Sequence, residues 1–213
     1  MPTHRLTESV IRDEAHLRSI VGTPSELVCR KVSARLNRLT RRFIELSPYV
    51  CVASCDSRGR CDVSPRGDPA GFVRILDERT LLLPERPGNR IADTLVNLLE
   101  DPRIALLFLI PGVTESFRVN GRATLTHDAA LLEPSTHEGK PPKLGILVDI
   151  EEAYTQCSKA SLRAGLWDSS RFRAATDVPT SGQIFAELVG DGFDAATYDA
   201  ERAKRYERRE GFY

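Results

Sequence analysis

The sequence predicts a mainly β protein, a small antiparallel β-barrel with added helices. From Tyr49 to Tyr154, six or seven short apolar or alternating runs are separated by turn residues, a pattern typical of small barrels. One segment with helical spacing lies among them, and further helical segments lie on both sides. We therefore expect the 213 residues to form a single domain. Residues 1–47 would be a helical extension, residues 48–157 the barrel, and residues 158–213 C-terminal helices and a tail.

The bulk composition is that of an ordinary globular protein, with 41% hydrophobic and 28% charged residues. The formal net charge is zero, so we expect neither a nucleic acid nor a membrane as a partner. The longest apolar run, residues 104–110, is too short to span a bilayer. Residues 1–18 contain acids and lack the apolar core of a secretory signal. We therefore expect a cytoplasmic protein.

Five cysteines without disulfide-rich spacing indicate reduced thiols. Cys51, Cys55 and Cys61, with Cys157 as a fourth ligand, raise the hypothesis of a metal site. However, Cys51 and Cys55 would share one face of a strand, no pair has the two-residue spacing of a zinc knuckle, and the four histidines are scattered. We favour structural thiols and expect no metal.

Apolar residues at helical spacing predict one long amphipathic helix before the barrel. The sequence TPSE at residues 23–26 is typical of a capping box with proline at the first helical position. The spacing continues to Leu46, and Ser47-Pro48 would end the helix. The opposite face is rich in Arg and Lys, and we favour a solvated face over an RNA-binding one.

The strands are predicted mostly in pairs. YVCVASC and RCDVSPRG form a hairpin around DSRG, and FVRIL and TLLLP form a second pair around DERT. Residues 103–110 read as a strand buried on both sides, and SFRVNGRATLT and LGILVDIEEAY supply two more strands.

After the barrel, SKASLRAGLW predicts a short helix ending near Gly165. Gly, Pro, Ser and Thr dominate residues 168–182, which we expect to be a loop. The charged segment DAERAKRYERREGF would be either a solvated terminal helix or a partly disordered tail.

The embedded helix, within residues 84–99, has an unusual charge pattern at its start. Asn89 is the expected N-cap, and Arg86 and Arg90 bracket it, although a helix N-terminus is itself partially positive. A bound phosphate would explain both arginines, because free N–H groups and a guanidinium together bind a phosphate monoester well. The alternative is that the arginines point to solvent or pair with neighbouring acidic residues.

The order of several motifs resembles that of the pyridoxamine 5′-phosphate oxidase-like flavoproteins. The motifs are DSRGRCDVSPRGD (56–68), LLLPERPGNR (81–90), DPRIALLFLIPG (101–112) and RVNGRA (118–123). CSKASLRAGLWD (157–168) resembles the C-terminal element of one bacterial branch. The resemblance implies an FMN-binding split β-barrel that works as a homodimer, with flavin held in two clefts at the subunit interface.

The resemblance also implies which residues contact the cofactor. The phosphate would meet Arg90 beside Asn89, and the flavin would run along one hairpin strand and the end of the next. The residues implied for FMN binding are Ser64, Pro65, Arg66, Gly67, Leu83, Pro84, Asn89, Arg90, Ser116, Arg118, Lys159, Arg163 and Trp167. Ser116 or Arg118 would approach the pyrimidine side of the ring, and the last three would contribute across the interface.

Two of these residues have a second interpretation. Arg66 is either aimed at an anionic ligand, which we favour, or a turn residue paired with Asp68. Trp167, the single tryptophan, is either a core anchor or an interface wall near the flavin.

The chain departs from authentic pyridoxamine phosphate oxidases in two places. It reads ERREGFY where they have Arg-Leu-x-Pro, and QCSK at residues 156–159 where related branch members have His-Cys-x-Lys. We therefore expect vitamin phosphates to be poor substrates.

The predicted function is that of a flavin oxidoreductase acting on a small organic substrate, in which FMN carries the chemistry and the catalytic residues stay unassigned. One alternative is a non-catalytic flavin- or haem-binding sensor on the same barrel. Another is a deazaflavin-dependent reductase, for which the zero net charge gives little support.

Overall fold

A computed structural model describes residues 10–213. Residues 1–9, part of the segment that argues against a secretory signal, lie outside the described residues. The chain forms two compact units, one up to Val32 and one from Ser33 to Tyr213. No helix among residues 10–213 is both long and apolar enough to cross a membrane.

The first unit contains two helices, α1 (Glu14–Val21) and α2 (Glu26–Arg30). No residue of either helix is buried. Ser25 occupies the N-cap of α2 without a side-chain hydrogen bond, so the capping box predicted at residues 23–26 is wrong.

The single long helix predicted before the barrel is also wrong. The chain leaves α2 at Lys31, and Ser33 then exchanges two main-chain hydrogen bonds with Ala153 of strand β7. A new helix, α3 (Arg38–Leu46), begins at a capping box in which the Asn37 side chain accepts the main-chain N–H of Thr40. The bonds to the sheet replace those that would have continued the helix.

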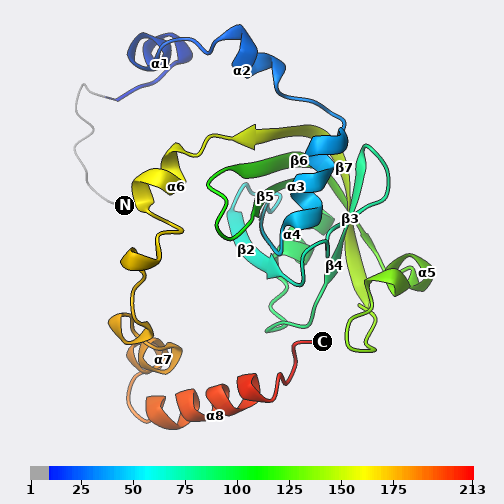
Figure 1. Cartoon of the computed structure of the whole chain (residues 1–213). Helices are drawn as coiled ribbons and strands as arrows, with labels where there is room; N and C mark the ends of the chain where they lie inside the picture. The colour runs from blue at the N-terminus through cyan, green and yellow to red at the C-terminus, as the bar shows by residue number, and fades with distance from the viewer. Residues whose placement is uncertain (1–9) are drawn as a thin grey trace. The chain divides into compact units, whose positions relative to one another are not determined.

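Helix α3 ends before Ser47-Pro48, as predicted, and packs on the barrel. Its Ile44 is fully buried, and the ring of Phe43 lies 5.7 Å from that of Phe117, centroid to centroid. Figure 1 shows α3 lying against the strands.

Seven antiparallel strands form one sheet in the order β2-β1-β5-β6-β7-β4-β3, which confirms the predicted mainly β barrel. Both predicted hairpin pairs are present, because β1 pairs with β2 and β3 with β4. The strands are β1 (Tyr49–Cys55), β2 (Cys61–Gly67), β3 (Arg74–Ile75), β4 (Thr80–Glu85), β5 (Arg103–Leu109), β6 (Ser116–Thr126) and β7 (Leu144–Gln156).

The sheet curls until β2 comes close to β4, although four strands lie between them in the sheet order. Arg66 of β2 and Glu85 of β4 form an ion pair of 2.9 Å across this gap, which we call the seam. The pairing of β6 with β7 shifts register between Asn120 and Gly121. At this irregularity the two backbones approach so closely that a Cβ atom on residue 121 would overlap the Asp149 carbonyl, so the position requires glycine.

Strand β5 is buried on one face within this chain, whereas both faces were expected to be buried. Ile104, Leu106 and Phe108 point into the core and are at most 4% exposed. The alternate residues Leu107 and Leu109 lie on the outer face and are half-buried.

The remaining helices surround the barrel or follow it. They are α4 (Asp93–Glu100), α5 (Ala129–Leu132), α6 (Lys159–Ala164), α7 (Ser181–Val189) and α8 (Ala195–Glu207), with short 3₁₀ turns at Glu133–Ser135, Ser169–Arg171 and Ala175–Asp177. The short helix ending at Gly165 is confirmed, as is the helical alternative for the charged C-terminal segment. Helix α7 was not predicted, because it begins within the segment expected to be a loop.

Candidate functional site

The seam carries a row of polar side chains that we call the β2 inner row: Asp62, Ser64 and Arg66. In the β1–β2 register, Ser64 lies opposite Val52 and Arg66 opposite Val50, and both valines are fully buried. Residues directly opposite each other in an antiparallel pair share a face. The inner row therefore faces the barrel interior at the edge where the sheet stays open.

Arg66 is held firmly in this row. Its Nε donates to Glu85 Oε2 at 2.9 Å, and its Nη1 donates to Ser64 Oγ at 2.9 Å and to the Pro65 carbonyl at 3.0 Å. Both side chains of the ion pair are only 16% exposed. The alternative pairing of Arg66 with Asp68 is wrong, because Glu85 takes that place. A guanidinium has five N–H donors, and those on Nη2 have no acceptor within residues 10–213.

Helix α4 begins beside the inner row. Thr94, in its first turn, is 3% exposed, and its Oγ1 lies 2.9 Å from Ser64 Oγ and 3.2 Å from Asp62 Oδ2. Further along the helix, Asn97 Nδ2 donates to Ser54 Oγ of β1 at 3.1 Å. The Thr94 contacts fix the start of α4 against β2, which carries Arg66, and the Asn97 bond fixes the helix against β1.

The predicted N-cap of α4 is wrong. The helix starts at Asp93 with Ala92 in the cap position, and Ala92 has no side chain that could accept a hydrogen bond. Asn89 instead accepts the main-chain N–H of Ile91 at 3.0 Å, which makes a turn before the helix. The first-turn N–H groups of α4 therefore lack a side-chain cap.

Two residues of this loop adopt left-handed backbone conformations that favour glycine. Arg90 has φ 68° and Ala92 has φ 60°. Each costs about 1–2 kcal/mol relative to right-handed geometry. The Arg90 side chain is exposed and has no ion-pair or hydrogen-bond partner within the described part of the chain. The loop thus presents a free guanidinium at the uncapped start of α4.

The sequence predicts that Arg86 lies beside the start of α4 and faces an anion there, but the structure pairs Arg86 elsewhere. Its Nε donates to Asp68 Oδ2 at 2.7 Å, and its Nη2 donates to the Ser135 carbonyl at 2.8 Å. The Asp68 side chain is only 2% exposed. Neither predicted alternative, solvent exposure or pairing with an adjacent acid, describes Arg86 correctly, since a strand-end carboxylate from β2 neutralises it.

Tyr213 packs on this second ion pair. Its hydroxyl donates to Asp68 Oδ1 at 2.7 Å, and the Arg86 guanidinium lies 5.1 Å from the ring centroid. The His137 ring lies 4.4 Å away, centroid to centroid. Burial and the hydrogen bond to the Asp68 carboxylate raise the pKa of the Tyr213 hydroxyl. The C-terminal segment is therefore anchored next to the seam.

Other residues predicted to bind the cofactor lie on the outer face of the sheet. Pro65, Cys51, Leu107, Arg118 and Tyr154 form one continuous cross-strand row from β2 to β7. Within it, Arg118 Nη1 donates to the Tyr154 hydroxyl at 2.8 Å. Two further predicted residues, Gly67 and Ser116, lie near the ends of the same strands. The structure therefore divides the predicted set between two faces.

Leu83 and Pro84 lie on β4 and are buried. Leu83 is fully buried in the core opposite Ile146, so its side chain is not available to a ligand.

Lys159 and Arg163 lie on the exposed surface of α6. Trp167 is partly exposed, and its Nε1 donates to the Val113 carbonyl at 2.8 Å. It lines an open hollow with Leu162 and Arg171. Within residues 10–213, no hydrogen bond or ion pair links Lys159, Arg163 or Trp167 to the β2 inner row.

Sequence reasoning missed Thr94 and Glu85, which complete the polar network of the seam. Glu85 follows the predicted Pro84, and Thr94 lies in the first turn of the predicted helix. However, the spacing of residues along the sequence does not show that β2 and β4 meet. Tyr213 was also missed, because the charged segment before it carries no signal of a docking site.

Comparison with known proteins decides the family. The sequence profile of the family described as "Pyridoxamine 5'-phosphate oxidase" matches residues 36–157, more than half of the chain. The chain belongs to this family. The match spans α3, all seven strands and α4, and it stops before α6. The resemblance predicted from the motifs is confirmed.

No curated protein matches the chain. Among solved structures, HupZ of Group A Streptococcus is 18% identical, with a TM-score of 0.47, 56% of this chain covered and 93% of the other. A Lactobacillus delbrueckii protein named for pyridoxamine 5′-phosphate oxidase is 20% identical, with a TM-score of 0.44 and 57% and 95% covered. An FMN-binding, oxidase-related protein of Nostoc punctiforme is 17% identical, with a TM-score of 0.38 and 55% and 76% covered. At these values the likeness carries no argument about function.

Proposed function

We propose that this member of the pyridoxamine 5′-phosphate oxidase family binds FMN and works as an oxidoreductase on a small organic substrate. The observation that carries the proposal is the arrangement at the seam, where Arg66 and the uncapped start of α4 lie side by side. That arrangement falls entirely within the part of the chain that the family profile matches.

The donors at the seam suit the phosphate of FMN. A phosphate monoester carries nearly two negative charges and three acceptor oxygens. Arg66 has unused donors on Nη2, Arg90 has no partner among the described residues, and the first N–H groups of α4 lack a cap. The hydroxyls of Ser64 and Thr94 are already used within the site, because Thr94 Oγ1 donates to Asp62 Oδ2 and Ser64 Oγ then donates to Thr94 Oγ1. Asp93, at the first helical position, opposes an anion, and Arg90 is the unpaired charge among the described residues that offsets it, because Glu85 already neutralises Arg66.

When bound, the flavin supplies the redox chemistry by accepting and passing on a hydride equivalent. The chain's own residues bind and orient it. Glu85 fixes the Arg66 guanidinium in one direction, and Thr94 fixes the helix start relative to β2. Ser116 and Arg118 are proposed to approach the ring from the outer face.

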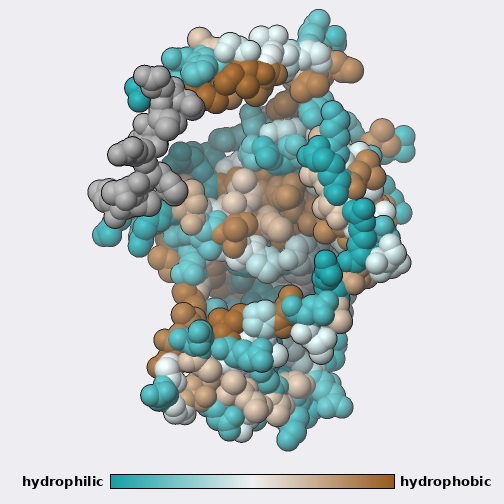
Figure 2. Space-filling view, turned by 90° about the vertical axis from the view of Figure 1, so that its left-hand side faces the viewer, coloured by the Kyte–Doolittle hydropathy of each residue, from teal (hydrophilic) through white to brown (hydrophobic). Residues whose placement is uncertain are grey.

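We further propose that a second copy of the chain covers the outer face of the sheet. Tyr49, Cys51 and Ala53 on β1 and Leu107 and Leu109 on β5 form a mostly apolar patch there. Figure 2 shows apolar side chains gathered in the middle of the visible face, on the side where β2 and β5 lie. A homodimer through this patch would also bring Arg118 close to the partner.

The cofactor proposal is tested with the purified protein, stripped of any chromophore and titrated with FMN. We expect flavin absorption bands near one FMN per chain. Arg66→Gln should weaken binding about tenfold to a hundredfold, because it removes a charge-assisted hydrogen bond worth about 1.5–3 kcal/mol. Arg58→Gln, in the exposed turn of the same hairpin, is the matched control and should bind FMN normally.

A haem-like absorption band with no flavin binding would support the sensor alternative instead. No binding of FMN by the parent protein would refute the proposal.

The dimer proposal is tested by light scattering at micromolar concentration. The parent should have the mass of two chains, and Leu107→Glu should have the mass of one, because a carboxylate would be buried at the centre of the patch. Leu39→Glu, at an exposed position of α3, is the control and should stay dimeric. A monomeric parent would contradict the proposal.

A further inference from the structure

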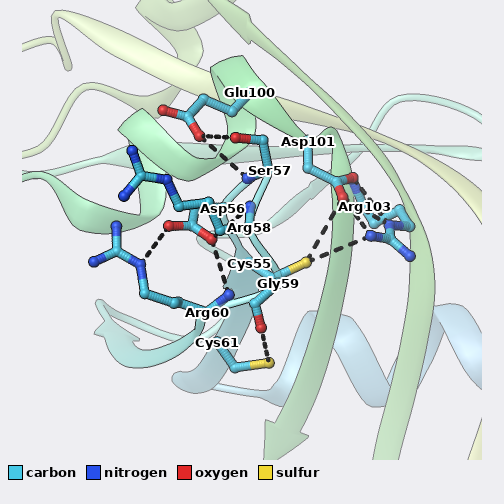
Figure 3. Close-up of polar contacts among 10 residues, drawn as sticks. All are labelled: Cys55, Asp56, Ser57, Arg58, Gly59, Arg60, Cys61, Glu100, Asp101 and Arg103. Carbon is cyan, nitrogen blue, oxygen red and sulfur yellow. Dashed lines mark hydrogen bonds and ion pairs between the residues drawn. The ribbon is translucent and has the colours of Figure 1, made fainter.

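The tip of the β1–β2 hairpin carries two cysteines on neighbouring strands. Cys55 is the last residue of β1 and Cys61 the first of β2, and the register places them directly opposite each other. The loop between them, residues 56–60, is tied down by Asp56, whose Oδ1 accepts the main-chain N–H groups of Arg58 and Arg60. Figure 3 shows this cluster, with both thiols on the same hairpin tip.

The backbone pairing brings the two Cα atoms close together. Asp56 donates its main-chain N–H to the Arg60 carbonyl at 3.0 Å, so the hydrogen-bonded pair falls at Asp56 and Arg60. Hydrogen-bonded and non-hydrogen-bonded pairs alternate along an antiparallel ladder, so Cys55 and Cys61 form a non-hydrogen-bonded pair. Such pairs have Cα atoms about 4.5 Å apart, within the roughly 4.4–6.8 Å that a disulfide bridges.

Both sulfurs are held by weak contacts in the reduced state. Cys55 Sγ lies 3.8 Å from Asp101 Oδ2 and 3.8 Å from Arg103 Nη2. Cys61 Sγ lies 3.8 Å from the Gly59 carbonyl, and Cys61 is exposed while Cys55 is half-buried. Closing a bridge would cost only these long contacts and a change of side-chain rotamer.

We propose that Cys55 and Cys61 form a site of reversible thiol oxidation, closed by low-molecular-weight disulfides such as glutathione disulfide. The Cys61 thiolate attacks one sulfur of the small disulfide, whose S–S bond breaks and releases one thiol. The Cys55 thiolate then attacks Cys61 Sγ and releases the second thiol. The two cysteines lose two electrons and two protons, and the small disulfide gains them as two thiols.

Cys51, the third cysteine of this hairpin, has no thiol opposite it on β2. Cys51 lies on the same strand and face as Cys55, but its partner on β2 is Pro65. It lies four residues from Cys55, a distance of about 13 Å along a strand, which is too far for a bridge. Cys51 therefore offers a matched control within the same strand.

Closure would have a structural consequence for the strand that carries the β2 inner row. β2 lies at the edge of the sheet, so one of its sides has no strand partner among residues 10–213. The tip is also tied to the end of α4, because Ser57 donates from its N and Oγ to Glu100 Oε2, at 3.1 and 2.7 Å. A bridge at the tip would fix the free end of β2 beside that contact.

The test treats the folded protein with glutathione disulfide, blocks remaining thiols and maps disulfides by mass spectrometry. We expect a Cys55–Cys61 bridge to form and dithiothreitol to restore both thiols, whereas the exposed Cys29 and Cys157 should carry only glutathione adducts. Cys51→Ser should give the same bridge. Cys55→Ser should stop at a glutathione adduct on Cys61, at least about tenfold more abundant than in the parent because no resolving thiol is near.

In denaturant the parent should lose this selectivity and form other pairings as well. A glutathione adduct on Cys61 that persists in the folded parent, or a bridge to another cysteine, would overturn the proposal. Retention of all five thiols in the folded protein would do the same.

Discussion

Replacing Arg90 by glycine is predicted to change stability and cofactor binding in opposite directions. Arg90 has φ 68° in the loop before α4, a conformation that costs an L-residue about 1–2 kcal/mol. Glycine removes this cost but adds about 0.4–1 kcal/mol of unfolded-state entropy. The free energy of unfolding of the apo-protein should therefore rise by about 1 kcal/mol or less, or about 2–4 °C or less in Tm for a chain of this size.

The effect on FMN binding has the other sign. If the phosphate lies at the start of α4, Arg90→Gly removes a charge-assisted hydrogen bond of about 1.5–3 kcal/mol. The dissociation constant should then rise about tenfold to a hundredfold. Ala92→Gly is the matched control, because its φ of 60° gives the same relief of strain without removing a charge. Its FMN affinity should fall by less than about fivefold, the cost of a more flexible loop.

The assays are denaturant unfolding of both apo-variants and fluorescence titration of each with FMN. Unchanged FMN affinity in Arg90→Gly would show that the phosphate does not meet this loop. Loss of about 1 kcal/mol of stability in both variants would show that the left-handed positions store no strain. Because the two readouts move independently, a general folding defect cannot imitate the predicted result.

Two further changes test the scaffold around the site. Gly121→Ala should lower the free energy of unfolding by at least about 1–3 kcal/mol, because its Cβ would overlap the Asp149 carbonyl; Gly88→Ala, with open space around it, should be nearly neutral in the same denaturant titration. Tyr213→Phe should abolish one pH-dependent component of the free energy of unfolding. Because the pKa of the Tyr213 hydroxyl is raised in the folded state, the hydroxyl contributes its full stability below about pH 10, the ordinary tyrosine pKa. This contribution is lost as the pH rises through the higher pKa of the folded state. Parent and variant melts that stay parallel through that range would contradict this.

The strands could be predicted closely from the sequence because their signals are local. SFRVNGRATLT matches β6, Ser116–Thr126, residue for residue, and the DSRG turn gives the β1–β2 pairing. Alternating apolar residues and turn residues are short-range features, so no knowledge of the rest of the fold is needed.

The helix boundaries depended on contacts that the sequence does not reveal. Apolar spacing runs through residues 31–37, but two main-chain bonds between Ser33 and Ala153 take that segment out of the helix. Helix α7 does carry a local signal, the capping box of Thr180 and Gln183, which the surrounding Gly, Pro and Ser obscured. The prediction of one long helix failed because hydrogen bonds to a distant strand interrupt that helix. Helix α7 was missed because the composition of its surroundings was given more weight than its capping box.

The candidate site shows the same limit more sharply. The sequence could indicate that Arg86 and Arg90 lie near a helix start, and the family resemblance that Arg66 is aimed at an anionic ligand, but neither could indicate the partners of these arginines. Glu85 ends β4 and Asp68 directly follows β2, and only the curl of the sheet brings Glu85 to Arg66 and Asp68 to Arg86. Asp68, two residues from Arg66, is the acidic partner that the sequence offers, and the structure replaces it with Glu85.

These pairings separate the three arginines by what each can do for an anion. Arg86 is neutralised by a nearly buried Asp68 and covered by Tyr213, so it positions the end of β4 and attracts little. Arg66 is neutralised by Glu85 but keeps the donors on Nη2, so it can direct a phosphate without supplying net charge. Attraction must therefore come mainly from Arg90 and the start of α4, against the charge of Asp93. We therefore expect Arg90 to supply the charge that attracts the phosphate, and Arg66 to set the direction in which the phosphate binds.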